Sequence, residues 1–344
     1  MNKQTEVIAI VNQKGGVGKT TTTANLAYSL AELGRDVLVI DFDSQASLTH
    51  YLNVGTRNEE AYYGIYELLV KNLGDPNYTD DEIEEATWTE MFEKCICRPT
   101  YRGRIDKKDA EIPFGFDLIP SSLALSDYDF WVSRGGMNRE AISELKMLIR
   151  KITAYHPYDY VLIDCSPYLG VMTMNAIVAA SSGCLIPTNL DLMSTRGVVN
   201  LIDVINSVQE QVMYIKNRAG EVIGETDEIH YGVVGVVLNL YREGRLVDVT
   251  IQSDLTRYYP FRIFENTIPE SVNAKKAVMG GMLYAQVYGK AKTAYHKLAK
   301  EVEKQVKDMK DSFKKSGYDK ETLIKHLGEA PESELTEVGA DDAD

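Results

Sequence analysis

The sequence predicts an α/β fold in which a mostly parallel, twisted sheet carries helices on both faces. Short aliphatic runs recur along the chain, amphipathic stretches with helical spacing separate them, and a glycine-rich turn joins the first run to the first helix. Strands that are apolar on both sides are typical of parallel sheets, which are buried on both faces. Hydrophobic residues make up 44% and charged residues 26% of the 344 residues, as in soluble globular proteins, and no apolar stretch is long enough to span a bilayer.

The individual elements follow in order from these patterns. An aliphatic strand at residues 7–11 leads into the glycine-rich turn, and a helix begins at Lys19 and ends before Gly34, a residue typical of helix C-caps. Further strands are expected at residues 37–40, 116–119, 160–163, 184–186, 233–238 and 263–268. Further helices are expected near residues 63–70, 139–153 and 198–212.

One domain is expected over residues 1–328, with an acidic insertion at about 71–112 on one sheet edge and a lysine-rich helix at about 284–315. Residues 329–344 hold seven acids and no Lys or Arg, which predicts a disordered acidic tail. The net charge of −14 argues against a chain coated with nucleic acid, but residues 290–320 hold ten lysines and five acids, so a local basic face is possible. The four cysteines match neither a disulfide framework nor a zinc spacing, and no signal peptide is evident, so we expect a cytoplasmic protein.

A phosphate-binding loop is predicted between the first strand and the first helix, at Asn12-Gln13-Lys14-Gly15-Gly16-Val17-Gly18-Lys19-Thr20-Thr21. Glycines let several backbone N–H groups point inward, and the helix N-terminus adds positive potential, so the segment forms a cradle for an anion. Lys19 would reach the β- and γ-phosphates, and the Thr20 hydroxyl would ligate Mg²⁺. A glycine turn that merely caps a helix is the alternative, which the strand before and the helix after disfavour. The predicted nucleotide contacts are Gly15, Gly16, Val17, Gly18, Lys19, Thr20 and Thr21.

This loop departs from the standard G-x-x-x-x-G-K-[ST] pattern. Gln13 stands where the first glycine should be, and Lys14 lies beside the turn, five residues before Lys19. A second lysine beside a triphosphate site is unfavourable unless it meets negative charge. A solvated surface lysine is the alternative interpretation of Lys14.

The run from Lys14 to Thr20 resembles the deviant Walker A signature of the ParA/MinD class of P-loop ATPases. The flanking Asn12-Gln13 and Thr21-Thr22 are similar to the ParA/Soj branch, which partitions chromosomes and plasmids. The resemblance continues at residues 37–45, 116–121, 158–167 and 184–187, and covers most of residues 5–300. Ser44, Ala46 and Ser166 depart from the family pattern, but none of these changes removes a reacting group.

Three carboxylates follow aliphatic runs beside the loop. Asp164 ends a buried run, where a carboxylate is costly unless it meets a metal or hydrogen-bond donors, and in P-loop proteins an acid there holds Mg²⁺. Asp41 and Asp43 end the neighbouring run, and a spacing of two places both on one side if the strand continues that far. The resemblance implies that Thr20, Asp41 and Asp164 surround Mg²⁺ and that Asp43 orients the attacking water. Ordinary turn or cap acids are the alternative.

The resemblance also implies a nucleotide-sandwich homodimer. Each Lys14 would contact the ATP bound by the other subunit, and a cation supplied from a partner subunit can raise the rate of phosphoryl transfer by ~10³–10⁵. Lys14, Lys19 and Asp43 are therefore the expected catalytic residues of a slow, partner-stimulated ATPase. Hydrolysis would dissolve the dimer, so the protein would act as a timer.

The base-binding side is less marked in the sequence. No Asn-Lys-x-Asp guanine signature is present, which favours ATP over GTP. Asn239 and the loop at Pro269 are placed like the adenine-side residues of the family. A turn residue at the end of a strand explains Asn239 equally well.

The basic residues indicate whether the chain binds DNA or another kind of partner. Family members of the partition branch bind double-stranded DNA without sequence preference when dimerised, and doubling a basic patch by symmetry makes weak phosphate contacts sufficient. Membrane binding is disfavoured because the chain ends in acids, which anionic lipid repels. The cysteine positions do not fit the bridged cluster of nitrogenase iron proteins, and the tyrosines are scattered. The DNA candidates are Arg242, Arg245, Arg257, Arg262 and the lysine-rich helix, each of which could instead be a solvated charge.

We therefore expect a cytoplasmic, nucleoid-associated ATPase that uses ATP and Mg²⁺, dimerises on ATP and binds DNA non-specifically. A ParB-like centromere-binding protein would stimulate hydrolysis and release it. A nucleotide-switched ATPase that positions a protein cargo without DNA is the alternative, and a module that binds ATP without hydrolysing it is a third.

Overall fold

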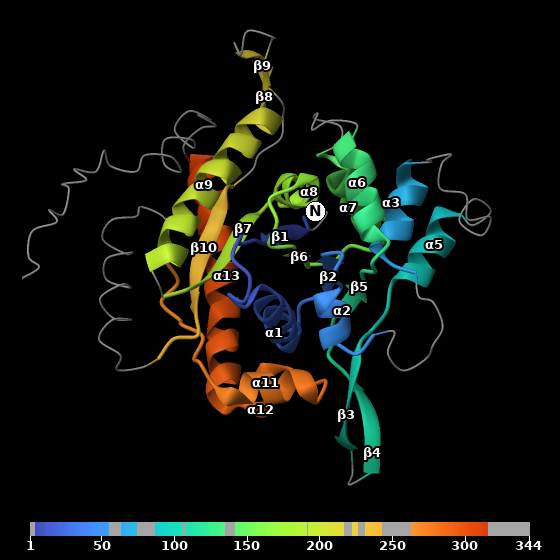
Figure 1. The fold of residues 1–344 in the computed structure, drawn as a ribbon, viewed down its shortest axis with the longest axis vertical. Coiled ribbons are helices and arrows are strands. Elements are labelled where there is room, and N and C mark those ends of the chain that lie inside the picture. The colour runs from blue at the N-terminus through green and yellow to red at the C-terminus, as the bar shows by residue number, and fades with distance from the viewer. Residues whose placement is uncertain are drawn as a thin grey trace, which may run out of the picture.

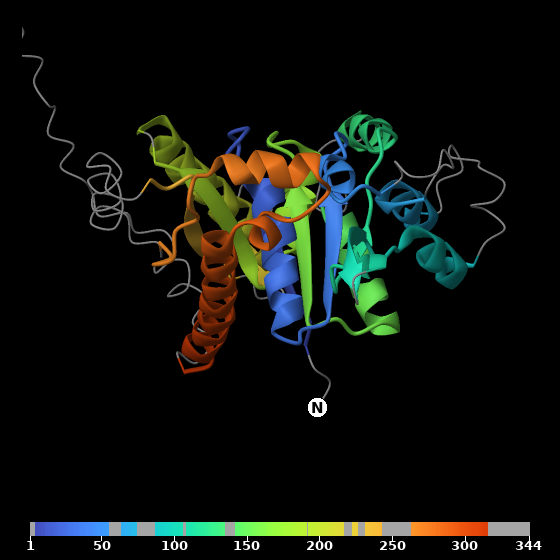
Figure 2. The same cartoon turned by 90° about the horizontal axis from the view of Figure 1, so that it is seen from below.

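A computed structural model describes residues 4–54, 63–73, 87–105, 108–134, 142–190, 192–216, 222–225, 231–242 and 263–315. A parallel six-stranded sheet with the order β10-β7-β1-β6-β2-β5 forms its centre, and helices lie on both sides of it (Figures 1 and 2). The strands are β1 (Glu6–Ile10), β2 (Val37–Phe42), β5 (Asp117–Ile119), β6 (Tyr160–Cys165), β7 (Gly183–Asn189) and β10 (Val233–Asn239). This confirms the predicted fold class.

The alternation of side chains along each strand creates two cores. In β1, Val7 and Ala9 contribute to one core, and Ile8 and Ile10 to the other. Since every one of these side chains is nearly inaccessible to solvent, the strand is apolar on both faces, as the aliphatic runs predicted. The first core lies under α3 (Ile65–Leu73), α5 (Trp88–Cys95), α6 (Leu125–Arg134), α7 (Glu144–Tyr155), α8 (Val171–Ala179) and α9 (Leu192–Met213). The second lies under α1 (Lys19–Glu32), α2 (Ser47–Tyr51), α11 (Val272–Met279), α12 (Tyr284–Val287) and α13 (Gly289–Lys315).

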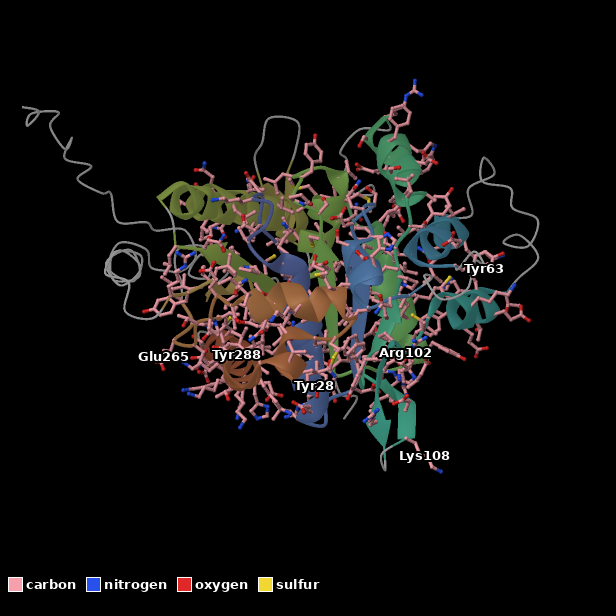
Figure 3. The ribbon with its side chains drawn as sticks, turned by 60° about the horizontal axis from the view of Figure 1, so that its bottom comes forward. Tyr28, Tyr63, Arg102, Lys108, Glu265 and Tyr288 are labelled. Atoms are coloured by element: carbon pink, nitrogen blue, oxygen red, sulfur yellow. The ribbon has the colours of Figure 1, made fainter. Side chains whose placement is uncertain are left out.

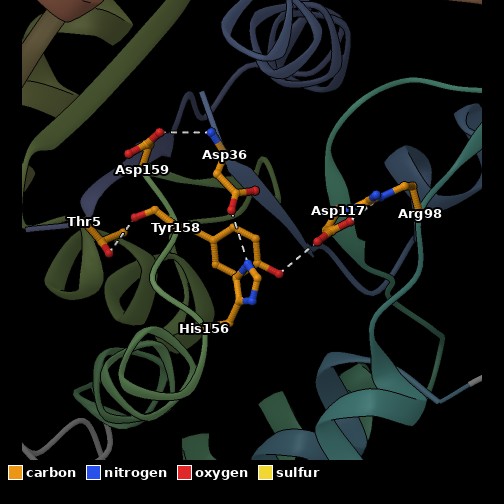
Figure 4. Close-up of polar contacts among 7 residues, drawn as sticks. All are labelled: Thr5, Asp36, Arg98, Asp117, His156, Tyr158 and Asp159. Atoms are coloured by element: carbon orange, nitrogen blue, oxygen red, sulfur yellow. Dashed lines mark hydrogen bonds and ion pairs between the residues drawn. The ribbon is translucent and has the colours of Figure 1, made fainter. Parts of the chain in front are cut away.

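The amino ends of the parallel strands are tied together by a polar network (Figure 4). Asp159 accepts a hydrogen bond from the backbone N–H of Asp36, at 3.0 Å, and the His156 ring lies 3.2 Å from the Asp36 carboxylate. The Tyr158 hydroxyl donates to Asp117 at 3.0 Å, and Arg98 pairs with the other oxygen of Asp117 at 2.9 Å. These contacts hold the amino ends of the strands together. The glycine-rich loop lies at the opposite, carboxyl ends of the strands.

The described part of the insertion lies at the β5 edge of the sheet. Cys97 pairs with Leu118 of β5 in an antiparallel bridge, and the chain then forms a hairpin of β3 (Thr100–Ile105) and β4 (Lys108–Pro113). This hairpin extends away from the helices, with Lys108 near its far end (Figure 3). Trp88 and Phe92 of α5 stack on each other and meet Tyr155 of α7 edge-on, which anchors the insertion to the body of the fold. A second hairpin, β8 (Tyr214–Lys216) and β9 (Val222–Glu225), follows α9.

The prediction of a strand at residues 263–268 is wrong. The segment runs beside β10, and Phe264 and Ile268 donate backbone hydrogen bonds to Val236 and Leu238, at 2.9 and 2.8 Å. Only an isolated bridge forms, because the intervening Asn266 donates its N–H to the Glu301 side chain of α13 instead of to the sheet. The Phe264 ring also covers Gly235, where a Cβ would lie 2.5 Å from it, so this stretch packs as a covering loop.

The lysine-rich helix is divided. α12 ends at Val287, Tyr288 adopts an extended conformation, and α13 then runs for 27 residues to Lys315. Residues 329–344, expected to form an acidic tail, lie outside the described residues. No helix in the described ranges is long and apolar enough to cross a membrane.

Candidate nucleotide-binding site

The glycine-rich loop curls between β1 and α1. Gly16 and Gly18 have φ angles of +75° and +89°, in the left-handed region that glycine adopts without steric cost. Gly18 is the N-cap of α1, and its carbonyl accepts the N–H of Thr22 at 2.8 Å, so the helix begins at Lys19 as predicted. A Cβ added at Gly15 or Gly16 would meet no atom within 4 Å. The outer side of the loop is therefore open at the end of α1 that favours an anion.

Two asparagines hold the loop from behind. The amide nitrogen of Asn12 donates to the Pro187 carbonyl of β7 at 2.7 Å, and its oxygen accepts the N–H of Lys14 at 2.9 Å. The amide nitrogen of Asn239, at the end of β10, donates to the Val17 carbonyl at 2.7 Å and to the Thr22 hydroxyl at 3.0 Å. Both asparagines are buried. The loop is thus braced by two neighbouring strands, which preorganises its backbone.

The two lysines of the loop have different surroundings. Lys19 is only 8% exposed, and its Nζ lies 3.3 Å from the carbonyl oxygen of Lys14, so its side chain reaches back across the loop. Burial lowers the pKa of Lys19, while Asp164 and Asp43 act in the opposite direction. Lys14, directly before the glycines of the turn, is exposed. The five-residue spacing therefore places one ammonium group inside the loop and the other at its rim.

Asp164 of β6 meets the first turn of α1. Its two carboxylate oxygens accept hydrogen bonds from the hydroxyls of Thr20, at 2.8 Å, and Thr23, at 3.0 Å. The side chain is 1% exposed, and burial raises its pKa despite these two donors and the nearby Lys19. The predicted pair of Thr20 and Asp164 is therefore in direct contact.

Asp41 lies beside Asp164 on the neighbouring strand. One oxygen of its carboxylate accepts both the N–H of Thr49, at 2.8 Å, and the Thr49 hydroxyl, at 2.7 Å. The other oxygen, Oδ1, is buried and has no hydrogen-bond partner within the described residues. Burial and the adjacent Asp164 raise the pKa of Asp41. Such an orphaned buried acceptor is destabilising unless a cation or a donor completes it.

Asp43 has a different environment, because β2 ends at Phe42. Its side chain is half-buried and accepts the N–H of Gln45 at 3.0 Å, while its carbonyl accepts the N–H of Ala46 at 2.8 Å. Asp41 and Asp43 therefore do not share a continuous strand, which was the condition for both to project on one side. Ala46 has a φ of +49°, and it stands where glycine is common in the resembling family.

The donor set fits Mg²⁺ held mainly by phosphate and water. Within the described part of the chain, no three His, Cys, Asp or Glu side chains form a group that could enclose a metal ion. Mg²⁺ usually binds through one or two carboxylates, several waters and substrate phosphates. The Thr20 hydroxyl, the Asp164 carboxylate and the unpartnered oxygen of Asp41 supply oxygen ligands of this kind. The residues present thus suit the predicted cation.

The predicted adenine-side residues are neighbours in the structure. Tyr241, two residues beyond Asn239, forms a parallel bridge with Pro269, and the Pro269 carbonyl accepts the Tyr284 hydroxyl at 2.9 Å. The Val17 carbonyl requires a donor, which fixes the orientation of the Asn239 amide. The Oδ1 atom of Asn239 is buried without a hydrogen-bond partner within the described ranges. Its contact with adenine stays a prediction.

Of the four arginines predicted to contact DNA, only Arg242 lies in the described part of the chain. It forms a two-pronged ion pair with Glu270, which neutralises its charge locally. Arg245, Arg257 and Arg262 lie outside the described residues.

The sequence did not identify Thr23 and Thr49 as part of the site, nor the contact that Asn12 makes. Thr23 could have been found, because its spacing of three from Thr20 places it on the same face of α1. Thr49 lies eight residues after Asp41 on a separate helix, and no local pattern connects the two. Asn12 was seen as part of the motif, but its contact with the carbonyl of Pro187 depends on the adjacency of β1 and β7.

Comparisons with known proteins agree with this geometry. The family model AAA_31, described as an AAA domain, matches residues 5–218. The chromosome partitioning protein ParA of Caulobacter vibrioides is 28% identical over 298 residues, which cover 86% of this chain and 93% of that protein. The sporulation initiation inhibitor protein Soj of Bacillus subtilis is 28% identical over 299 residues, covering 86% and 98%.

A solved structure has the same fold. Cobyrinic acid a,c-diamide synthase from Mycobacterium smegmatis, with bound ADP and magnesium, matches with a TM-score of 0.60 and 25% identity, over 86% of this chain and 93% of that chain. The family model, the two partition relatives and the braced glycine-rich loop lead to one assignment. The chain belongs to the AAA_31 family and is a ParA/Soj-like member of the deviant Walker A P-loop ATPases.

Proposed function

We propose that the protein is an ATP-dependent DNA-partition ATPase. It binds ATP and Mg²⁺ at the glycine-rich loop, dimerises in the ATP state, binds double-stranded DNA without sequence preference, and is released after a ParB-like centromere-binding partner stimulates hydrolysis. It acts in the cytoplasm at the nucleoid. The observation that carries the proposal is the opposite placement of two loop lysines, Lys19 inside and Lys14 at the exposed rim.

The inner half of the site suits a triphosphate. Lys19 and the backbone N–H groups of residues 15–21 bind the phosphates, and the first turn of α1 adds positive potential. Thr20, Asp41 and Asp164 hold Mg²⁺, which neutralises charge on the phosphate oxygens when it is bound. Asp43, beyond the end of β2, orients the attacking water. Phosphoryl transfer needs little else from the protein, because positioning and charge neutralisation supply most of the rate.

The rim supports a role for a second subunit. Lys14 has its backbone N–H bound to Asn12 and its carbonyl close to Lys19, so its main chain is fixed by its own loop. Its side chain starts from the exposed face of this rigid turn. We place it on the nucleotide of the facing subunit, where its charge completes the second site and makes ATP part of the dimer interface.

Adenine recognition follows from Asn239. Its amide nitrogen braces the loop, and its unpartnered Oδ1 can accept the exocyclic amino group of adenine, whereas guanine carries an oxygen at that position. The loop at Pro269 lies alongside. This arrangement favours ATP over GTP.

DNA binding draws on the basic surface of α13. Of its exposed lysines, Lys297, Lys300, Lys304 and Lys307 recur at helical spacing on one face. Arg242, engaged by Glu270, is the weaker candidate. Symmetric doubling of the α13 surface in a dimer would make non-specific phosphate contacts sufficient.

Retention of duplex DNA with ATP and with ADP tests the proposal. We expect salt-sensitive retention with ATP and little with ADP, together with stimulation of ATP turnover by DNA and a centromere-binding partner. Retention that does not depend on the nucleotide would contradict it. Turnover that DNA leaves unchanged would instead favour positioning of a protein cargo.

A further inference from the structure

One face of α13 carries a row of exposed lysines, which we call the lysine stripe: Lys290, Lys297, Lys300, Lys304 and Lys307. Their spacings of 7, 3, 4 and 3 keep all five on one side of the helix. The opposite side, with Tyr295, Leu298 and Val302, is buried in the core beneath α1. The stripe therefore faces away from the core, and α13 itself lies at the outside of the fold (Figure 2).

Within the described residues, the five lysines of the stripe are not held by ion pairs. Lysines on the flank of the same helix are paired, since Lys292 meets Glu32 at 2.7 Å and Lys310 meets Glu6 at 2.6 Å. Three acids of α13, Glu301, Asp308 and Asp311, also lie on this side of the helix, and Glu301 is engaged by the N–H of Asn266. Five lysines against three acids leave this side of α13 with an excess of positive charge, on a chain whose net charge is −14.

The sequence beyond α13 holds the complementary charge. Residues 329–344 contain seven carboxylates and no Lys or Arg, which is half of the net charge of −14. The 13 residues at 316–328 can span up to about 45 Å when extended. Lys290 lies 25 residues before the end of α13, or about 38 Å along the helix axis. The acidic segment can therefore reach every lysine of the stripe on the same chain.

We propose that residues 329–344 dock on the lysine stripe and compete there with DNA. Tethering gives the acidic segment an effective concentration on the order of mM, so individually weak ion pairs suffice to occupy the surface. DNA displaces the segment only from a dimer, because the two stripes of a dimer together bind DNA more strongly than a single stripe does. The docked segment thus makes DNA retention depend more strongly on the ATP-bound dimer, and this part of the inference rests on the proposed function.

The occupant we favour is the chain's own segment and not anionic lipid. A lipid surface would have to approach a helix that is followed, after 13 residues, by a segment with seven carboxylates, which it repels. The tethered segment always stays close to the stripe and carries the opposite charge. The docking is electrostatic, so the charge of the segment matters more than the order of its residues.

Carbodiimide cross-linking of the full-length protein tests the docking without nucleotide or DNA. The reagent joins a carboxylate to an amine that touches it. At low salt we expect amide links from residues 329–344 to Lys297, Lys300, Lys304 and Lys307, and their loss at about 0.5 M salt, where exposed charges are screened. In a mixture of ¹⁴N- and ¹⁵N-labelled protein the links should join peptides of one label. Mixed-label links, or equal linking to Lys94 and Lys108 on the insertion, would overturn the proposal.

DNA retention with ATP tests the competition. Replacing the seven acids by Gln or Asn in the full chain should tighten retention by about 3- to 10-fold at low salt, and a scrambled segment of the same charge should behave as wild type. Lys300→Gln with Lys304→Gln should weaken retention, and Lys94→Gln with Lys108→Gln, which removes equal charge elsewhere, should not. Unchanged retention after neutralisation would refute the competition. Stripe cross-links in a protein that never retains DNA would uphold the docking and refute the DNA part of the proposed function.

Discussion

Asp41 and Asp164 lie opposite each other in register on β2 and β6, and both carboxylates are buried on the face of the sheet that α1 covers. Two buried acids on neighbouring strands repel each other unless a cation or a proton intervenes. Each has part of its oxygen surface satisfied by threonine, and one oxygen of Asp41 has no partner within the described residues. This arrangement leaves a buried carboxylate oxygen that a bound cation would satisfy.

The first prediction concerns the stability of the metal-free protein. Burial raises the pKa of Asp41 and of Asp164 above the unfolded value of about 4. A carboxyl whose pKa is raised by folding contributes stability that is fully present below the unfolded pKa and is lost as the pH rises through the folded pKa. With EDTA, Asp41→Asn should therefore gain stability relative to wild type as the pH rises from 4 towards neutral. Urea unfolding at several pH values measures the free energy of unfolding of both proteins. A difference between them that does not change with pH would contradict the prediction.

The second prediction concerns Thr49, whose hydroxyl donates to Asp41 and accepts the N–H of Ser121 at 2.9 Å. Thr49→Val keeps the shape but leaves both buried groups without this partner. We expect the free energy of unfolding to fall by about 2–4 kcal/mol. Thr153→Val is the matched control, because the Thr153 hydroxyl bonds only carbonyls of its own helix, and it should cost less than about 1 kcal/mol. Equal losses in the two variants would refute the special role of Thr49.

The third prediction concerns base selectivity. Asn239→Ala removes both the brace on Val17 and the acceptor proposed for adenine. Loss of the brace should weaken the binding of ATP and of GTP alike, whereas loss of the acceptor should weaken the binding of ATP alone. We expect the ratio of the two dissociation constants to move towards one, with ATP binding weakened by about 10-fold or more. An unchanged ratio would leave Asn239 as a brace only.

The fourth prediction separates nucleotide binding from turnover. Lys19→Ala should weaken ATP binding by about 30-fold or more, because it removes a buried ammonium group from the phosphate cradle. Asp43→Ala should bind ATP with near-normal affinity, lose turnover and accumulate as the ATP-bound dimer. Titration of a fluorescent ATP analogue and size-exclusion chromatography give the two readouts. Equal loss of ATP binding in both variants would refute the division of roles.

The sequence predicted the parallel sheet and the loop because both depend on local pattern. Aliphatic runs identify strands that are buried on both faces, and the order of strand, glycines and helix identifies an anion cradle. The same logic placed Asp164 at a strand end, and its contact with Thr20 follows once β1 and β6 are neighbours.

The remaining features depend on contacts between distant segments. The run at 263–268 holds Ile263, Phe264 and Ile268 and was therefore predicted as a strand. Asn266 instead bonds to Glu301 of α13, and no periodicity reveals this competition. The hydroxyl partner of Asp41 comes from a helix that begins after β2 has ended. Likewise, Arg242 follows β10 and pairs with Glu270, 28 residues further along the chain, and no local pattern predicts this ion pair.

Whether Lys14 acts on the ATP of the other subunit can be measured with a mixture of two inactive variants. Lys14→Ala and Asp43→Ala subunits should each be inactive alone. If Lys14 acts across the dimer, a mixed dimer has one site with both groups, and an equal mixture should recover up to about one quarter of wild-type turnover, since half of the random dimers are mixed. If Lys14 acts within its own subunit, no site in the mixture is complete, and turnover that stays at the level of the separate variants would contradict the account.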